Sequence, residues 1–569
     1  MNKKHFLIAI FISAFLTLII QFDLTRAIVF NNYLDGDDLA LGKEDRAYYL
    51  TLINESSKGN WHLGSPFLKE WSRSLYLYPA LNVNTVGFLK KVLDVNVKTT
   101  QILLDYGAVF ILMVLILYLF RTIFRSYYLG YLTAIAFALF PRMLIWDRII
   151  SPQINFIPLL VFLIFYFSQC RLWKREVGLG ITAGLLFYVY PYYSTFALVL
   201  LIITDAWHCI KLRRFLWNTV YKYFIIGTII SYYLVHLWKV HNLFYYNESI
   251  RRIGALYSRF PSGLYTQILL LFLLGVLFFV WRYLLYKERF LFFPVPSSFE
   301  KVLLGLVTSL VVLNQQIITG MQLEFNSHYL PVIIIFIVAS FGIVMMFFLH
   351  FFSRYKKFII TGVICILGFF VFNVLMFQIR NDSFRMKESF ASTNALGVFH
   401  WFKENHINNK TIYAPPELGN RIMLLTDNYL FFHPAEELHL IPTSELIDRF
   451  TYFDITNSDV TNHPEKYQLA IFGQIFNSVR EKDNVIRHLK AVFSFDRFVP
   501  IPLDSRYLHY DFELMKKKRM NITLNQFSET LHKYNVDYVV YSKGDEKSVY
   551  GDISGRVVFS NESYLIKAR

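Results

Sequence analysis

The sequence predicts a polytopic α-helical membrane protein with about eleven transmembrane helices and a C-terminal extracytoplasmic α/β domain. Three observations lead to this fold class. The 569 residues are 55% hydrophobic and only 17% charged, which is more apolar surface than a soluble protein of this size buries. Long apolar segments recur along the first two thirds of the chain, and basic residues gather in alternate loops between them.

The apolar segments are long enough to cross ~30 Å of hydrocarbon. They lie at residues 6–22, 104–120, 128–145, 154–170, 177–192, 195–209, 219–237, 264–281, 302–319, 329–350 and 357–378. Residues 1–378 are therefore predicted to form the transmembrane domain. A cleaved signal peptide is the alternative for residues 1–26, but LTRA is a poor small-residue cleavage site, so we expect an uncleaved anchor.

The loops between these segments predict the orientation in the membrane. Five alternate links are basic, at residues 121–125, 171–176, 211–215, 282–289 and 353–357, whereas the opposite links are nearly free of Lys and Arg. Because basic loops stay in the cytoplasm, the N-terminus is expected there. The same rule accounts for the net charge of +16, so the predicted partner is membrane lipid and not nucleic acid.

Two parts of the chain are then expected outside the cytoplasm: a large first loop at residues 23–103 and a tail at residues 379–569. In the tail, GVFHWFKENH predicts an amphipathic helix and KTIYAP a strand. TLHKYNVDYVVYSKG predicts a helix leading into a strand, and RVVFSNESYLIKAR a closing hairpin. Neither part contains cysteine, which excludes a disulfide framework.

The first loop gathers acids in a chain that is otherwise poor in them. Asp37 and Asp38 stand in the turn-like YLDGDDLALG, and Glu44 and Asp45 open a helix-like run, KEDRAYYLTLINESS, which ends at Gly59. A carboxylate beside a span end can act as a general base or as a ligand for a divalent cation such as Mg or Mn. The alternatives are a solvated turn for the first pair and a helix N-terminus, where acids are favoured, for the second.

The spacing of this run resembles that of a known family. Asp45, Tyr49, Gly59 and Trp61 form the pattern Asp-x3-Tyr-x9-Gly-x-Trp. It resembles the first-loop signature of GT-C glycosyltransferases, especially the branch of the protein O-mannosyltransferases and the bacterial aminoarabinose lipid A transferases. In that family the acidic pair usually has Asp first, whereas Asp45 here follows Glu44.

The resemblance implies an activity and the residues that perform it. It implies transfer of a sugar, with inversion, from a polyprenyl-phosphate donor to a hydroxyl of a lipid, glycan or protein acceptor on the extracytoplasmic face. Asp45 is then the expected base, with Glu44 as its alternative and Tyr49 at the substrate. Relatives have a second acid near a Lys-Pro-Pro later in the loop; here LGSPFLKEW supplies Glu70 without that motif.

Four arginines are candidates for binding the donor phosphate, because the guanidinium fork matches phosphate oxygens. Arg142 and Arg148 lie around the outer end of the third span, and Arg251 and Arg252 lie in the amphipathic SIRRIGALYSRF. The alternatives are interfacial arginines that extend from helix ends to the headgroups, and an amphipathic segment that lies on the membrane surface.

Polar residues also mark the outer end of a later span. Gln315 and Gln316 would be costly in hydrocarbon, so we expect them to face a polar cavity, which His328 and Tyr329 reach from the next span. Such a cavity could bind sugar hydroxyls or a phosphate. Alternatively, these side chains join helices through hydrogen bonds.

Two other classes of function compete with the enzyme. A transporter or flippase for a lipid-linked glycan would be expected to show a repeat of hydropathy between halves and charges deep in its spans, and neither is evident. A non-catalytic membrane scaffold would leave the acidic first loop unexplained. The sequence therefore favours the glycosyltransferase.

Overall fold

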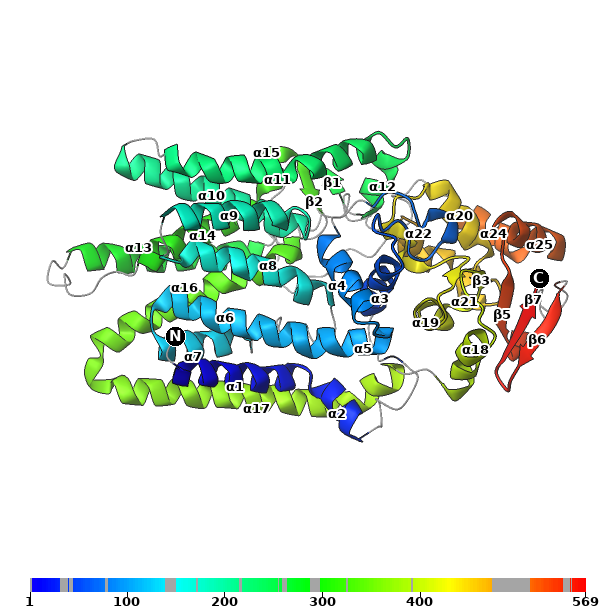
Figure 1. Cartoon of the computed structure of the whole chain (residues 1–569), viewed down its shortest axis with the longest axis horizontal. Coiled ribbons are helices and arrows are strands. Elements are labelled where there is room, and N and C mark those ends of the chain that lie inside the picture. Colours follow the sequence, from blue (N-terminus) through cyan, green and yellow to red (C-terminus); the bar gives the residue numbers. More distant parts are fainter. Residues whose placement is uncertain are drawn as a thin grey trace.

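The computed structural model describes residues 3–30, 39, 44–76, 80–138, 150–169, 172–213, 217–253, 255–257, 264–286, 297–323, 326–389, 392–472, 512–545, 553 and 555–569. Long helices lie side by side in one part of the molecule, and a mixed α/β part covers one end of them (Figure 1). The N-terminus lies toward the other end of the bundle (Figure 1).

The bundle consists of long apolar helices that run roughly parallel to one another (Figure 1). They are α1 (Lys3–Ile20), α2 (Phe22–Phe30), α5 (Val97–Ile102), η2 (Leu103–Ala108), α6 (Val109–Phe124), α7 (Tyr127–Ala138), α8 (Ile150–Phe167), α9 (Leu172–Leu186), α10 (Pro191–Leu212), α11 (Trp217–His241), α13 (Leu264–Tyr286), α14 (Ser297–Leu313), α16 (Leu330–Phe351) and α17 (Lys356–Ser389). Helix α17 passes through residue 378, where the predicted transmembrane domain ends.

Five helices in the described part of the chain are long and apolar enough to cross a membrane. They are Lys3–Ile20, Val97–Phe124, Pro191–Leu212, Thr219–His241 and Leu330–Leu349. Shorter apolar helices at Tyr127–Ala138, Ile154–Phe167, Thr266–Val280 and Lys357–Asn373 accompany them. A helical bundle of membrane-protein composition is therefore confirmed, whereas the number of about eleven spans stays a prediction.

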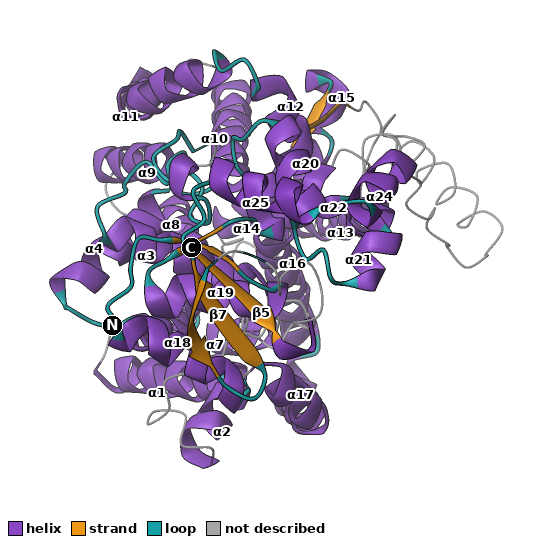
Figure 2. Ribbon diagram, turned by 90° about the vertical axis from the view of Figure 1, so that its right-hand side faces the viewer, coloured by secondary structure: helices purple, strands orange, loops and turns teal. Residues whose placement is uncertain are grey.

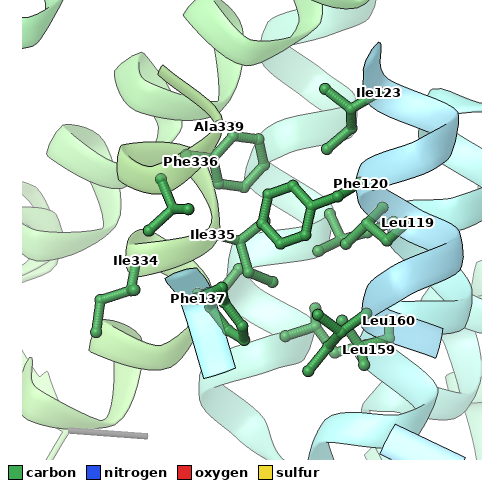
Figure 3. Packing of buried hydrophobic residues seen from close by; sticks show 14 of the residues in the cluster. Leu119, Phe120, Ile123, Phe137, Leu159, Leu160, Ile334, Ile335, Phe336 and Ala339 are labelled. Atoms are coloured by element: carbon green, nitrogen blue, oxygen red, sulfur yellow. The ribbon is translucent and has the colours of Figure 1, made fainter. Parts of the chain in front are cut away.

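Figure 3 shows a part of the bundle core in which large apolar side chains of α6, α7, α8 and α16 meet. Phe120 of α6, Phe137 of α7, Leu160 of α8 and Ile335 of α16 are all fully buried. Close packing also uses Gly305, where a Cβ atom would lie 1.9 Å from the ring of Phe336. Small residues at such crossings let membrane helices approach, because dispersion contacts replace the hydrophobic effect there.

Short elements link the bundle to the C-terminal part. The first loop contains α3 (Glu44–Ser57), η1 (Lys69–Trp71) and α4 (Leu81–Val92), and α3 lies between bundle and C-terminal part (Figure 1). The remaining short elements are α12 (Tyr246–Ile253), β1 (Ala255–Tyr257), α15 (Gln315–Thr319), β2 (Met321–Leu323), η5 (Asn326–Tyr329) and η6 (Ser353–Tyr355). Strands β1 and β2 pair antiparallel, which joins two loops that are distant in sequence.

The C-terminal part is a five-stranded sheet with helices around it (Figure 2). Its helices are α18 (Thr393–Glu404), α19 (Pro416–Thr426), η7 (Pro434–Leu438), α20 (Thr443–Tyr452), α21 (Ser458–Asn462), η8 (Pro464–Tyr467), α22 (Leu469–Phe472), α24 (Phe512–Met520), α25 (Leu524–Lys533) and η10 (Lys543–Asp545). Its strands are β3 (Thr411–Tyr413), β4 (Tyr429–Leu430), β5 (Tyr538–Ser542), β6 (Arg556–Ser560) and β7 (Tyr564–Ala568).

The sheet has the order β4-β3-β5-β7-β6 and is mixed. Strand β3 pairs parallel with β4 and β5, whereas β7 pairs antiparallel with β5 and β6. Three elements predicted for the tail are present in the structure. The amphipathic helix is α18, the helix that leads into a strand is α25 with β5, and the closing hairpin is β6 with β7. These local predictions are confirmed because each depends on periodicity and turn residues within one short segment.

Candidate functional site

Helix α3 carries the first-loop signature and begins with its two acids. It spans Glu44–Ser57, and Gly59 beyond it has a φ of +98°, which glycine adopts without strain. The helix therefore ends where the sequence predicts. It contacts α4 in its own loop, α8 in the bundle and α19 in the C-terminal part, so it lies at their junction (Figure 1).

A buried ion pair fixes the first turn of α3 to the bundle. Arg46 directly follows Asp45, and its Nη2 donates to Oδ1 of Asp105 at 2.8 Å. Asp105 lies in the π-helical turn η2 and its side chain is fully buried. Separating such a pair would leave a buried charge without its partner, which is costly. The pair therefore holds the backbone of residue 45 against the end of the Val97–Phe124 helix.

The backbone of α3 is described from its first residue, but the side chains of Glu44 and Asp45 lie outside the described residues. The same holds for four further predicted site residues: Asp37, Asp38, Arg142 and Arg148. Their assigned roles stay predictions.

Glu70 belongs to a charged contact between the first loop and α20. Its carboxylate accepts a hydrogen bond from the buried guanidinium of Arg449. Arg449 also donates to Oε1 of Glu445 at 3.0 Å and to the carbonyl oxygen of Phe431 at 2.6 Å. Trp71, next to Glu70, donates to the same Glu445 oxygen at 2.9 Å. The structure thus gives Glu70 a partner in the C-terminal part.

The two arginines of α12 differ in exposure. Arg251 is exposed. Arg252 is buried, and its Nη2 donates to the carbonyl oxygens of His439 and Ile441 at 2.8 and 2.7 Å. Its Nη1 donates to Oγ1 of Thr443 at 2.8 Å. The guanidinium of Arg252 therefore holds the chain between η7 and α20, whereas Arg251 is an exposed residue.

The remaining candidates fall into two groups. Tyr49 is half-buried on α3, with its ring 5.3 Å from that of Tyr48. His328 and Tyr329 gather instead around α10: the His328 ring stacks on Tyr192 at 4.7 Å, and the buried Tyr329 meets the same ring edge-on at 5.2 Å. His328 also shares a hydrogen bond with the hydroxyl of Tyr190, the residue that precedes α10.

On α15, Gln315 is half-buried and Gln316 fully buried, with Nε2 of Gln316 donating to the carbonyl oxygen of Leu313 at 3.2 Å. Both glutamines precede η5 in the loop that reaches His328. The structure thus packs His328 and Tyr329 of η5 against α10, and Glu70 against the C-terminal part.

The sequence analysis missed a buried polar segment around η7. His433 stacks on Phe67 of the first loop, with ring centroids 4.1 Å apart. The backbone N–H of Ala435 donates to its Nδ1 at 3.1 Å, so its Nε2 carries the proton and donates to Oδ1 of Asn420 at 2.9 Å. Burial lowers the pKa of His433 to about 3, and the ring is neutral.

Two further ionisable groups in this segment are also buried at the first loop. Both carboxylate oxygens of Glu436 lie 2.8 Å from the hydroxyl of Ser65, and burial raises the pKa of Glu436 well above its ordinary value. The ring of His439 lies among Tyr48, Phe67 and Tyr76 at 5.7 to 5.9 Å. Burial lowers the pKa of His439 to about 3. Burial disfavours the charged form of each of these groups, because a buried charge is costly.

The sequence does carry a signal for this segment, since HPAEELH places two histidines and two acids within seven residues. The signal was missed because the histidines lack the spacing of a metal site. In the described residues no three His, Cys, Asp or Glu side chains come close enough to hold a metal ion.

A cavity of about 880 Å³ opens beside this segment. Its wall is formed mainly by the C-terminal part, from α19, η7, α20 to η8, and the end of β5. Tyr48 of α3 completes the wall from the first loop. The cavity therefore adjoins the helix that begins with Glu44 and Asp45.

No protein-family model matches the chain, and no curated protein does. Among solved structures, it is similar to the apo oligosaccharyltransferase of Archaeoglobus fulgidus, with a TM-score of 0.47 and 12% identity over 96% of this chain and 70% of that one. The same enzyme tethered to an acceptor peptide with the NVT sequon has a TM-score of 0.47 and 11% identity over 99% of this chain and 74% of that one. ArnT from Cupriavidus metallidurans bound to undecaprenyl phosphate has a TM-score of 0.47 and 10% identity over 100% of this chain and 98% of that one.

Oligosaccharyltransferase and ArnT, an aminoarabinose lipid A transferase, are both members of the GT-C superfamily.

Proposed function

We propose that the protein is a membrane glycosyltransferase that moves a sugar from a polyprenyl-phosphate donor to an acceptor hydroxyl on the extracytoplasmic face. One observation carries the proposal: the helix that begins with Glu44 and Asp45 is packed between bundle and C-terminal part and is fixed there by the buried pair of Arg46 and Asp105. A solvated loop would not bury an ion pair beside its acids, because the burial has a desolvation cost.

Asp45 is the proposed general base. It accepts the proton of the acceptor hydroxyl while that oxygen attacks the anomeric carbon of the donor sugar. The bond from the anomeric carbon to the phosphate oxygen breaks, and its electron pair leaves with the polyprenyl phosphate. Attack from the side opposite the phosphate inverts the anomeric configuration. Glu44 is the alternative base, and Glu70 contributes to the site through its contact with Arg449.

The leaving phosphate needs positive charge, which arginines on the same face of the membrane can supply. Arg142, Arg148 and Arg251 are the proposed phosphate ligands, and Arg251 is exposed as this role requires. Arg252 instead positions the C-terminal part, since its Nη atoms donate to protein oxygens. A divalent cation such as Mg or Mn at the first-loop acids stays a prediction, since the side chains of Glu44 and Asp45 lie outside the described residues.

The proposed orientation places the C-terminal part outside the cytoplasm. The basic loops predict a cytoplasmic N-terminus, and the N-terminus lies at the end of the bundle remote from the C-terminal part (Figure 1). Aliphatic and aromatic side chains on the outside of the bundle, such as those of Phe272 and Phe279 on α13, offer the polyprenyl chain an apolar surface.

The Asp45→Asn variant tests the proposal. Purified protein is incubated with polyprenyl-phosphate sugars extracted from the producing cells and with a membrane extract of the same cells as the source of acceptor, and release of polyprenyl phosphate is followed by mass spectrometry. Loss of a general base lowers turnover ~10²- to 10⁴-fold. Glu404→Gln, which neutralises an exposed acid at the end of α18, is the matched control and is expected to keep full turnover. Wild-type turnover in Asp45→Asn would refute the assignment of the base.

A further inference from the structure

The cavity beside η7 has the size of a site for a small organic ligand. Its volume of about 880 Å³ lies in the upper part of the range of ~300–1,000 Å³ that is usual for such sites. A ligand of several rings therefore fits better than a single ring. Because the wall combines residues of the first loop, of the segment from 413 to 470 and of β5, the cavity exists only when these parts are folded together.

Aromatic rings form much of the wall. They include Phe432, Phe450, Phe453, Tyr467 and Tyr541. Phe432 and Phe453 lie 4.9 Å apart, and the ring of Tyr467 lies 6.4 Å from that of Phe450. A pyranose ring has apolar C–H faces that pack on aromatic rings and a rim of hydroxyls that needs hydrogen bonds. The wall supplies the first of these requirements.

Polar groups with unused hydrogen-bonding capacity supply the hydrogen bonds that the hydroxyls of a sugar need. The amide oxygen of Asn420 accepts a hydrogen bond from Nε2 of His433. The Nδ2 of Asn420 has no partner among the described residues. The hydroxyls of Thr456 and Ser542, also in the wall, have no partner there either. All three residues are half-buried, so water can reach these groups and the hydroxyls of a ligand can take its place.

The charges in the wall select the kind of ligand. The described lining contains two carboxylates, Glu417 and Asp454, and one ammonium, Lys466. Lys466 is already paired with Asp459 at 2.7 Å, so its charge is offset outside the cavity. His433 is neutral, because burial lowers its pKa. Because the one ammonium in the described lining is already paired, the wall offers a phosphate or carboxylate no unpaired positive charge, and it suits a neutral sugar or an amino sugar better.

The position of the cavity assigns it to one substrate. Tyr48, in its wall, stands three residues after Asp45 on α3, which is about 4.5 Å along a helix that rises 1.5 Å per residue. We propose that this cavity binds the acceptor, and that the acceptor is a saccharide chain of neutral or amino sugars. The assignment as acceptor site rests on the proposed function, whereas saccharide binding by itself does not.

Binding of three trisaccharides to the purified full-length protein tests the inference without turnover. The probes are a glucose trimer, a glucosamine trimer and a galacturonate trimer, titrated by isothermal calorimetry. We expect the first two to bind and the anionic trimer to bind at least about tenfold more weakly. Equal or tighter binding of the galacturonate trimer, or no binding by any of the three, would overturn the inference.

The double variant Thr456→Val/Ser542→Ala locates the binding. It removes two hydroxyls that lack protein partners, so the fold loses no hydrogen bond among the described residues, and binding of the neutral trimer is expected to weaken about tenfold. Ser444→Ala, an exposed serine of α20 outside the cavity, is the control and should bind as wild type. Unchanged binding in the double variant places the saccharide elsewhere and rejects the cavity.

The assays distinguish this inference from the proposed function. If Asp45→Asn keeps wild-type turnover while the trimers still bind through the cavity, the base assignment fails and the saccharide site stands. If Asp45→Asn loses turnover but no trimer binds, the enzyme stands and the saccharide site fails. Competition of a peptide, and not of a trimer, with the natural acceptor would also reject the inference.

Discussion

Replacing Arg46 by Met should destabilise the protein strongly, because it leaves the carboxylate of Asp105 buried without a partner. The two side chains are 6% and 0% exposed, with nitrogen and oxygen 2.8 Å apart. For charge centres about 4 Å apart at an effective dielectric constant of about 20, their attraction is ~4 kcal/mol. This agrees with the about 3–5 kcal/mol usually lost when one member of a buried pair is removed. Met keeps the helix propensity of α3.

The assay is the thermal midpoint in detergent, followed by circular dichroism at one fixed heating rate because unfolding of a membrane protein is irreversible. Arg73→Met removes an exposed arginine of the same loop and should change stability by no more than about 0.5 kcal/mol. The double variant Arg46→Met/Asp105→Leu removes both charges and should recover most of the loss.

Two results would refute this reasoning. One is a midpoint for Arg46→Met that matches Arg73→Met, which would mean that the pair contributes nothing. The other is a double variant less stable than Arg46→Met alone, which would mean that Asp105 stabilises the fold without its partner. Turnover adds a functional measure, since the pair holds the first turn of α3 and its loss should lower activity even at temperatures where the variant stays folded.

The remaining predictions concern the C-terminal part. Lowering the pH from 6.5 to 5 should destabilise the protein, because His433 and His439 stay neutral when folded, with pKa values near 3, but bind protons when unfolded. The two histidines together can contribute at most about 2.7 kcal/mol per pH unit, and Glu436, whose pKa burial raises, opposes them, so we expect a smaller net loss, measured as a lower thermal midpoint at pH 5. Arg449→Met should cost about 3 kcal/mol, whereas Arg556→Met, at an exposed strand position, should be neutral, and equal midpoints for the two would contradict the role of the Arg449 cluster.

The elements that the sequence determined by itself are those set by local pattern. The apolar segments became the long helices, since a span needs a continuous apolar run that any window of the sequence reveals. The helix after Glu44 stops at Gly59 because only a residue tolerant of positive φ fits there. The hairpin of β6 and β7 was also predictable, because its two strands and its turn lie within 13 residues.

Only the tertiary structure decided which distant residues meet. Nothing in the spacing of Arg46 and Asp105, or of Glu70 and Arg449, predicts that they pair, because such contacts depend on the packing of whole helices. The neutral state of His433 and His439 is likewise a result of burial, since an isolated imidazole titrates near neutral pH. Local sequence sets the period and ends of each helix, but desolvation and partner choice arise only when the first loop and the C-terminal part close over one another.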